Sequence, residues 1–200
     1  MKKLRRSFYT RSTIAVAKDL LGKIFIRKIG NSSLSGMIVE TEAYLHTDPA
    51  SHSYRGKTER NSAMFDTGGH LYVYFTYGMH FCANVVTSNK NTGEAVLIRA
   101  VEPIEGIEMM TKNRLLDDRR RHSDDRRLHT LTNGPAKFAQ AFQLTRQQSG
   151  IDLTKSEMFI VDAGVNVRRM IVAGVRVGIS AGKGKKWRFY LKNNPWVSKK

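Results

Sequence analysis

The sequence contains a single cysteine, Cys82, so neither an intrachain disulfide nor a thiolate metal cluster can form. It also lacks any run of about 18 apolar residues that would cross a bilayer. The basic start, MKKLRR, leads into a segment broken by Arg11, Lys18 and Asp19 rather than into the apolar core of a signal peptide. We therefore expect a cytoplasmic protein with no membrane association, whose fold depends on packing alone.

Acidic residues are also scarce. The chain has 17 Asp and Glu against 34 Lys and Arg, which gives a formal net charge of +17 at pH 7. A surplus of this size favours a polyanionic partner, because clustered cations attract phosphates over long distances. The alternative from charge alone is a solvated surface, or the charge of a basic ribosomal protein. The tail 183–200 holds seven Lys and Arg and no acid, and we expect it to contact phosphates.

Apolar patterns along the 200 residues indicate both helices and strands, with no repeat and no interdomain linker. We therefore predict one α+β domain over residues 1–200. Helices are expected at 12–21, at 135–144 behind Pro135, and in a segment opened by Pro103. Strands are expected at 22–30, 35–45, 70–87 (a hairpin that turns near 77–78), 94–103, 157–163, 170–180 and 187–191.

Two segments show no such pattern. Residues 46–69 read as a long loop, and long loops inside compact domains are often functional, so we expect this one to line a site. Residues 111–127 hold seven Lys and Arg and four Asp, which indicates a solvated connection. The pairs at 117–118 and 124–125 are acids of the kind found in two-metal nucleases, but ion pairing with the neighbouring arginines is the simpler interpretation.

The run VETEAY places Glu40 and Glu42 two residues apart on a strand, so both carboxylates should face one side of the sheet. In a basic protein such a pair serves either in chemistry or in a salt bridge, and the spacing alone does not choose between them. Tyr44 shares the face of Glu42. Tyr72, Tyr74, Tyr77 and His80 crowd one hairpin, where they could stack on an extruded base or simply form core and cross-strand pairs.

The histidines show neither an HExxH motif nor a Cys/His spacing typical of zinc sites. We therefore expect no metal and no cofactor.

Ordered blocks across almost the whole chain resemble the alkyladenine (3-methyladenine) DNA glycosylase family. They are VETEAY, His52-Ser53, RNSAMF, LYVYFTYGMHFCANVV, VLIRAVEP, NGPAKFAQA and RFYLKNNPWVS. The resemblance implies a curved antiparallel sheet with surrounding helices and a protruding hairpin that intercalates into DNA. It also implies a monomeric base-excision-repair enzyme without a cofactor, which flips damaged purines out of double-stranded DNA and hydrolyses their N-glycosidic bond.

The resemblance also implies roles for individual residues. Glu42 would activate the attacking water, held together with Arg99 and the backbone carbonyl of Val177, while Glu40 would be structural. As the base departs, the sugar carbon becomes cationic, so one carboxylate can stabilise that charge and accept the water proton. No lysine falls in the matching site, so we expect a monofunctional enzyme that leaves an abasic site rather than a lyase.

Base recognition maps in the same way. Tyr44 would cover one face of the flipped base, with His52 and Tyr74 on the other, and Asn84 would crowd the amino group of guanine. The intercalating residues implied are Tyr77 as the wedge, Gly78 as its turn and Met64 near the gap. The sequence does not rank alkylated adenine, hypoxanthine and ethenoadenine as substrates. A non-catalytic nucleic-acid-binding protein of the same fold and a metal-dependent nuclease remain the alternatives.

Overall fold

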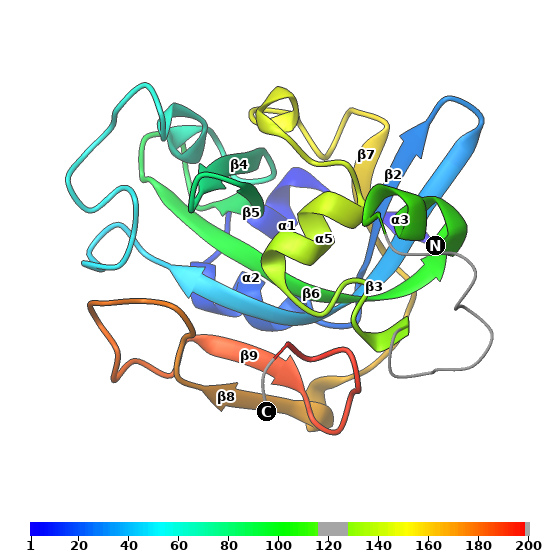
Figure 1. Ribbon diagram of the computed structural model, residues 1–200. Coiled ribbons are helices and arrows are strands. Elements are labelled where there is room, and N and C mark those ends of the chain that lie inside the picture. The colour runs from blue at the N-terminus through cyan, green and yellow to red at the C-terminus, as the bar shows by residue number, and fades with distance from the viewer. Residues whose placement is uncertain (116–127, 199–200) are drawn as a thin grey trace.

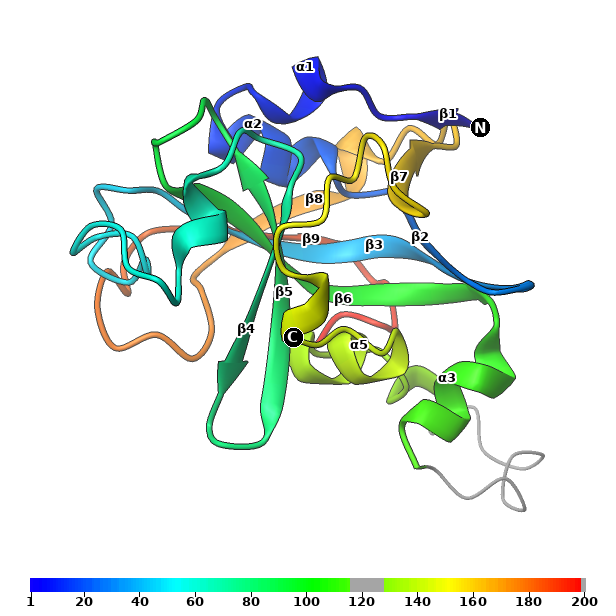
Figure 2. The ribbon, with the colours of Figure 1, turned by 90° about the horizontal axis from the view of Figure 1, so that it is seen from above.

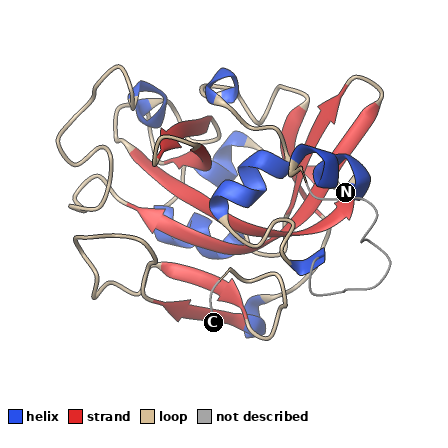
Figure 3. Ribbon diagram, in the orientation of Figure 1, coloured by secondary structure: helices blue, strands red, loops and turns tan. Residues whose placement is uncertain are grey.

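A computed structural model describes residues 1–115 and 128–198, and all strands in this part of the chain belong to one nine-stranded antiparallel sheet (Figures 1 and 3). The helices are α1 (Arg6–Tyr9), α2 (Thr13–Asp19), α3 (Ile107–Asn113) and α5 (Pro135–Ala141), with 3-10 turns η1 (Ser62–Phe65), η3 (Arg146–Gln148) and η4 (Arg168–Met170). The strands are β1 (Lys2–Lys3), β2 (Ile24–Ile29), β3 (Ser32–Tyr44), β4 (Leu71–Thr76), β5 (His80–Thr87), β6 (Glu94–Glu105), β7 (Met158–Asp162), β8 (Ile171–Gly174) and β9 (Arg188–Leu191). The predicted α+β class is confirmed.

Strand β3 organises the sheet, whose main path runs β1-β7-β2-β3-β6-β5-β4. One edge of β3 pairs with β6 from Ser35 to Tyr44, while the other edge pairs first with β2 and then, at residues 40–42, with β9. The register of β3 against β6 shifts on both sides of Glu40, which marks a bulge. This change of partner brings β9 and the C-terminal segment beside the two predicted carboxylates.

Helices cover both faces of the long curved strands β3 and β6, as the view from above shows (Figure 2). Helices α1 and α2 lie on one side, and α3 and α5 lie on the other. Phe25 of β2 meets Phe138 and Phe142 edge-on, with ring centroids 5.3 and 5.6 Å apart. These apolar contacts fix the sheet on which the predicted site is built.

The strands expected at 22–30 and 35–45 are present and pair as a hairpin, and so is the hairpin expected at 70–87. In the second, Thr76 pairs with His80, so the chain reverses over residues 77–79, and Tyr77 and Gly78 both adopt positive φ, +50° and +67°. Glycine reaches this conformation without steric cost, whereas tyrosine rarely does. The hairpin projects from the body of the molecule (Figure 2), and its tip is therefore free to meet a partner.

Two predicted elements are present, but one end of each was predicted wrongly. Pro103 does not open a helix: β6 continues to Glu105, and α3 begins after Gly106, whose φ is +80°. Proline is accepted in β6 because it lies where the register against β3 shifts. The strand predicted at 170–180 ends at Gly174. Beyond it, the backbone amide of Val177 donates to the side chain of Glu42 rather than to a neighbouring strand.

The connection 111–127 falls largely outside the described residues, as do its acidic pairs. Among the residues that the structure does describe, no helix is long and apolar enough to cross a membrane.

Candidate active site

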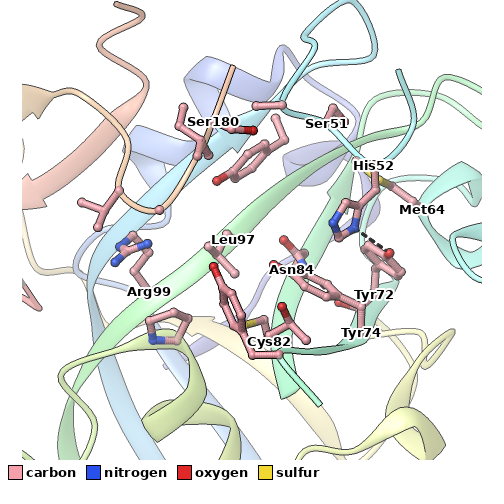
Figure 4. A pocket seen from close by; sticks show the side chains of 18 of the residues that line it. Ser51, His52, Met64, Tyr72, Tyr74, Cys82, Asn84, Leu97, Arg99 and Ser180 are labelled. Carbon is pink, nitrogen blue, oxygen red and sulfur yellow. Dashed lines mark hydrogen bonds between the residues drawn. The ribbon is translucent and has the colours of Figure 1, made fainter. Parts of the chain in front are cut away.

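A cavity of about 500 Å³ opens where the end of β3, the loop 45–70, the β4–β5 hairpin and the loop 175–187 meet. Eight of the residues predicted for the site line it: Tyr44, His52, Met64, Tyr74, Tyr77, Asn84, Arg99 and Val177. Figure 4 shows Arg99 and Ser180 on one side, His52, Tyr72 and Tyr74 on the other, and Leu97 and Asn84 between them. The long loop thus lines the cavity as predicted.

The carboxylate of Glu42 lies behind the residues that line the cavity and has no exposed surface. Three lining residues contact it. The hydroxyl of Tyr44 donates to Oε2 at 2.7 Å, the amide N–H of Val177 donates to Oε1 at 2.8 Å, and Nη1 of Arg99 lies 3.2 Å from Oε1. Val177 contacts Glu42 through its amide N–H. That its carbonyl helps to hold the attacking water stays a prediction. These three contacts hold the carboxyl group of Glu42 in place next to the cavity.

Glu40 faces the same side, as the spacing predicts, but its partners differ. Its carboxylate accepts from Arg99 Nε and Arg188 Nη1, both at 3.1 Å, and from the amide of Ser198 at 2.7 Å. Burial alone would lower the pKa of Arg99, but the charges of Glu42 and Glu40 raise it. Glu40 therefore joins β3, β6, β9 and the C-terminal segment, and its contacts are structural.

Aromatic rings form the wall opposite Arg99. His52 Nδ1 lies 2.9 Å from the hydroxyl of Tyr72, and its ring meets Tyr74 edge-on at 4.4 Å between centroids. Tyr72 and Tyr74 are stacked at 5.6 Å. Desolvation, and then the charge of Arg60, lower the pKa of His52 below its usual value, and burial raises the pKa of Tyr72 to about 12. The wall is therefore uncharged near neutral pH.

Tyr44 comes from the end of β3, away from this wall. Burial, followed by the charge of Glu42, raises the pKa of its phenol. The guanidinium of Arg176 lies over its ring, 4.7 Å from the centroid, and Arg176 does not line the cavity. Tyr44 is therefore clamped both at its hydroxyl and through its ring.

Asn84 of β5 lines the cavity between these walls. It is 4% exposed, and its Nδ2 donates to the carbonyl of Tyr72 at 3.0 Å. This bond occupies one amide proton and holds the side chain rigidly.

The hairpin tip carries two exposed apolar side chains, Tyr77 at 80% and Met79 at 70%. The sequence prediction missed Met79, although its position two residues after Tyr77 at the end of a hairpin was a usable signal. Met64, predicted near the intercalated gap, lies in η1 at 2% exposure, in a small apolar cluster with Tyr72. It supports the aromatic wall from within the protein.

Among the described residues, no group of three or more His, Cys, Asp or Glu is arranged to hold a metal ion.

The sequence prediction also missed the buried ion pair between Arg176 and Asp48. No local signal reveals this pair, because the partners lie 128 positions apart.

Comparison with known proteins identifies the family of this chain. The family model described as methylpurine-DNA glycosylase (MPG) matches residues 7–195. A protein of Carboxydothermus hydrogenoformans named "Putative 3-methyladenine DNA glycosylase" is 48% identical over 198 residues, covering 98% of this chain and 99% of the relative. A protein of Clostridium novyi with the same name is 47% identical over 205 residues, covering the whole of both chains. The chain therefore belongs to the methylpurine-DNA glycosylase family.

Proposed function

We propose that this protein is a base-excision-repair glycosylase that flips an alkylated purine such as 3-methyladenine out of double-stranded DNA and hydrolyses its N-glycosidic bond. The observation that carries the proposal is the carboxylate of Glu42, held by three donors immediately behind an aromatic cavity of about 500 Å³. In a protein of net charge +17, an acid beside a base-sized cavity serves either in chemistry or in an ion pair, and unlike Glu40 the carboxylate of Glu42 is contacted by three residues that line the cavity.

The contacts of Glu42 leave room for one water. A carboxylate offers about four lone-pair positions. Among the described residues, Oε1 has contacts with Val177 and Arg99, and Oε2 accepts only from Tyr44. One acceptor position on Oε2 is therefore left for a water proton. Since Glu42 has no exposed surface, a small shift of the Tyr44 phenol must admit that water when a base enters.

The reaction then needs no cofactor. As the bond between the base and the sugar carbon breaks, its electron pair leaves with the base, and the developing cation on the sugar is stabilised by the carboxylate. The water oxygen bonds to the sugar carbon and its proton passes to Glu42. No lysine is among the described residues that line the cavity, which supports hydrolysis to an abasic site rather than a Schiff-base lyase step.

Damaged bases would be selected by stacking and by lability. Tyr44 lines one side of the cavity, and His52 and Tyr74 line the other. Because the rings of His52 and Tyr74 are nearly perpendicular, one of them would stack on a flipped purine while the other contacts it edge-on. A cationic alkylated base gains about 0.5–2 kcal/mol from cation–π attraction in such a slot. The lowered pKa of His52 keeps the imidazole neutral, so it does not repel that cation. Neutral lesions such as hypoxanthine or ethenoadenine would rely on stacking alone.

The exposed hairpin tip would fill the gap left by the flipped nucleotide. Tyr77 is held at positive φ on the tip and is 80% exposed, which suits insertion between base pairs. The basic surface would bind the phosphates on either side. One chain supplies every group used here, so we propose that the protein acts as a monomer, in the cytoplasm where the chromosome lies.

Release of free base from defined duplexes tests the proposal. Duplexes carrying a single 3-methyladenine or hypoxanthine are incubated with the protein in EDTA, and the free base is separated by chromatography. We expect release by the wild type. Glu42→Gln should bind the same duplexes but react at least about 100-fold more slowly, since a general base contributes about 10²–10⁴-fold. Glu105→Gln, at the exposed end of β6, is the matched control and should leave the rate unchanged.

The alternatives give different results in the same assay. Tight binding with no release from any lesion would identify a non-catalytic nucleic-acid-binding protein. Strand scission that EDTA abolishes would identify a metal-dependent nuclease. Equal rates for the wild type and Glu42→Gln would remove Glu42 from the mechanism.

A further inference from the structure

The two loops that wall the cavity are joined by one buried ion pair. Arg176 lies in the loop that carries Val177, and Asp48 lies in the loop that carries His52. Both side chains have no exposed surface. Burial alone would raise the pKa of Asp48, but the hydrogen bond and charge of Arg176 keep it below its usual value. The Asp48 carboxyl is therefore charged at neutral pH, although neither side chain of the pair lines the cavity.

The guanidinium of Arg176 also contacts each wall directly. Nη1 donates to the backbone carbonyl of Ala43 at 3.0 Å, which lies between Glu42 and Tyr44 in the sequence. Its central carbon lies over the ring of Tyr44 at 4.7 Å and over Trp187 at 5.3 Å. One side chain thus contacts the end of β3, both loops and the ring that faces the cavity.

The backbone closes tightly over this pair at Gly182. A Cβ at that position would lie 2.8 Å from Oδ1 of Asp48 and 3.0 Å from Nη2 of Arg176. Only glycine fits there without moving the pair. Tight packing of this kind transmits a displacement to its neighbours instead of absorbing it.

We propose that Arg176 and Asp48 are positioning residues for excision, which together hold the amide of Val177 on Glu42 and the ring of Tyr44 in the cavity wall. The proposal rests on the proposed function. Arg176 immediately precedes Val177 in the chain, so the position of Arg176 determines the direction of the Val177 N–H. Lysine should not replace it, because a point charge cannot bond to two partners in one plane and stack on a ring at the same time.

Two variants disturb the pair in different ways. Asp48→Asn removes the charge that holds Arg176, and Gly182→Ala inserts a methyl group against both partners. Each has a matched control. Asp19→Asn alters the surface pair with Arg11. Gly164→Ala adds a methyl group at a glycine of similar φ, +76° against +63°, where a Cβ meets nothing within 4 Å. The controls separate a lost charge and a strained backbone from a disturbed site.

The experiment combines single-turnover base release with affinity for DNA that carries an uncleavable abasic-site analogue. Hydrogen exchange of the Val177 amide, followed by NMR, provides a readout that needs no activity. We expect Asp48→Asn and Gly182→Ala to slow release by about 10- to 100-fold, the loss expected from a misplacement of about 1 Å. Affinity should be unchanged, and the Val177 amide should lose its protection. Arg176→Lys should behave as Asp48→Asn does, and both controls as the wild type.

Retained protection of Val177 together with a wild-type release rate in both variants would overturn the proposal. So would a rate that falls only in proportion to the fraction unfolded. Should the wild type itself release no base, the proposed function fails, and the exchange of Val177 alone still decides whether the pair positions that amide.

Discussion

Substituting the two buried glutamates one at a time should affect different properties: Glu40→Gln should lower stability, and Glu42→Gln should abolish base release. Glu40 accepts from Arg99, Arg188 and the amide of Ser198. Loss of its charge leaves Arg188 buried without this carboxylate, and it loosens the C-terminal segment from the sheet. Glu42 differs, because an amide at position 42 can still accept from the Val177 N–H, and Arg99 keeps its bond to Glu40.

The magnitudes follow from these contacts. Breaking a buried ion pair by removing one partner costs about 3–5 kcal/mol. For a chain of this length about 1 kcal/mol corresponds to about 2–4 °C in Tm, so Glu40→Gln should lower Tm by about 6–20 °C. Glu42→Gln exchanges one set of hydrogen bonds for another and should change stability by less than about 1.5 kcal/mol.

The assay pairs thermal unfolding with single-turnover base release, well below the lower Tm. Glu40→Gln should unfold early and still release base, whereas Glu42→Gln should unfold like the wild type and release almost none. Glu105→Gln should match the wild type in both measurements. An inverted result, with Glu40→Gln stable but inactive and Glu42→Gln active, would refute the assignment of the two acids. Equal loss of stability in both would refute the energetic reasoning.

Three further changes test the cavity and the hairpin. Tyr77→Ala should weaken binding to DNA carrying a flipped-nucleotide analogue about 5- to 160-fold, the equivalent of one base–aromatic stack of about 1–3 kcal/mol; unchanged binding would contradict a wedge. Asn84→Ser should raise the release of undamaged guanine relative to 3-methyladenine, measured on one duplex, and an unchanged ratio would argue against discrimination by Asn84. As pH falls through the lowered pKa of His52, the imidazole gains charge, so release of cationic 3-methyladenine should drop more steeply than release of neutral hypoxanthine. His52→Gln should remove this difference.

Features decided by neighbouring residues could be read from the sequence. The alternation of strand residues placed Glu40 and Glu42 on one face, and Pro135 marked the start of α5. Tyr77-Gly78 marked the hairpin turn, since its conformation depends on the two residues themselves. Each of these is a short-range property, so the pattern in the chain carries it directly.

The roles proposed for Glu40 and Glu42, structural and catalytic respectively, could not be read from local patterns. The two acids have the same chemistry and face the same side, and only their partners from β6, β9 and the C-terminal segment distinguish them. The resemblance to a family proposed the assignment, and the contacts give it a physical basis. Local patterns also misplaced Pro103 and the segment 170–180, because a register shift and a distant acid determine the structure there.

The sequence by itself determined the strands, the turn and the set of residue types available for chemistry. Tertiary structure alone decided which of them meet. The amide of Val177 reaches Glu42 across 135 positions, and Arg176 reaches Asp48 across 128. Such contacts form only when the whole sheet and both loops are in place, because their free energy depends on burial by many distant segments together. The cavity forms only when the sheet and both loops come together, so no short segment of the sequence predicts it.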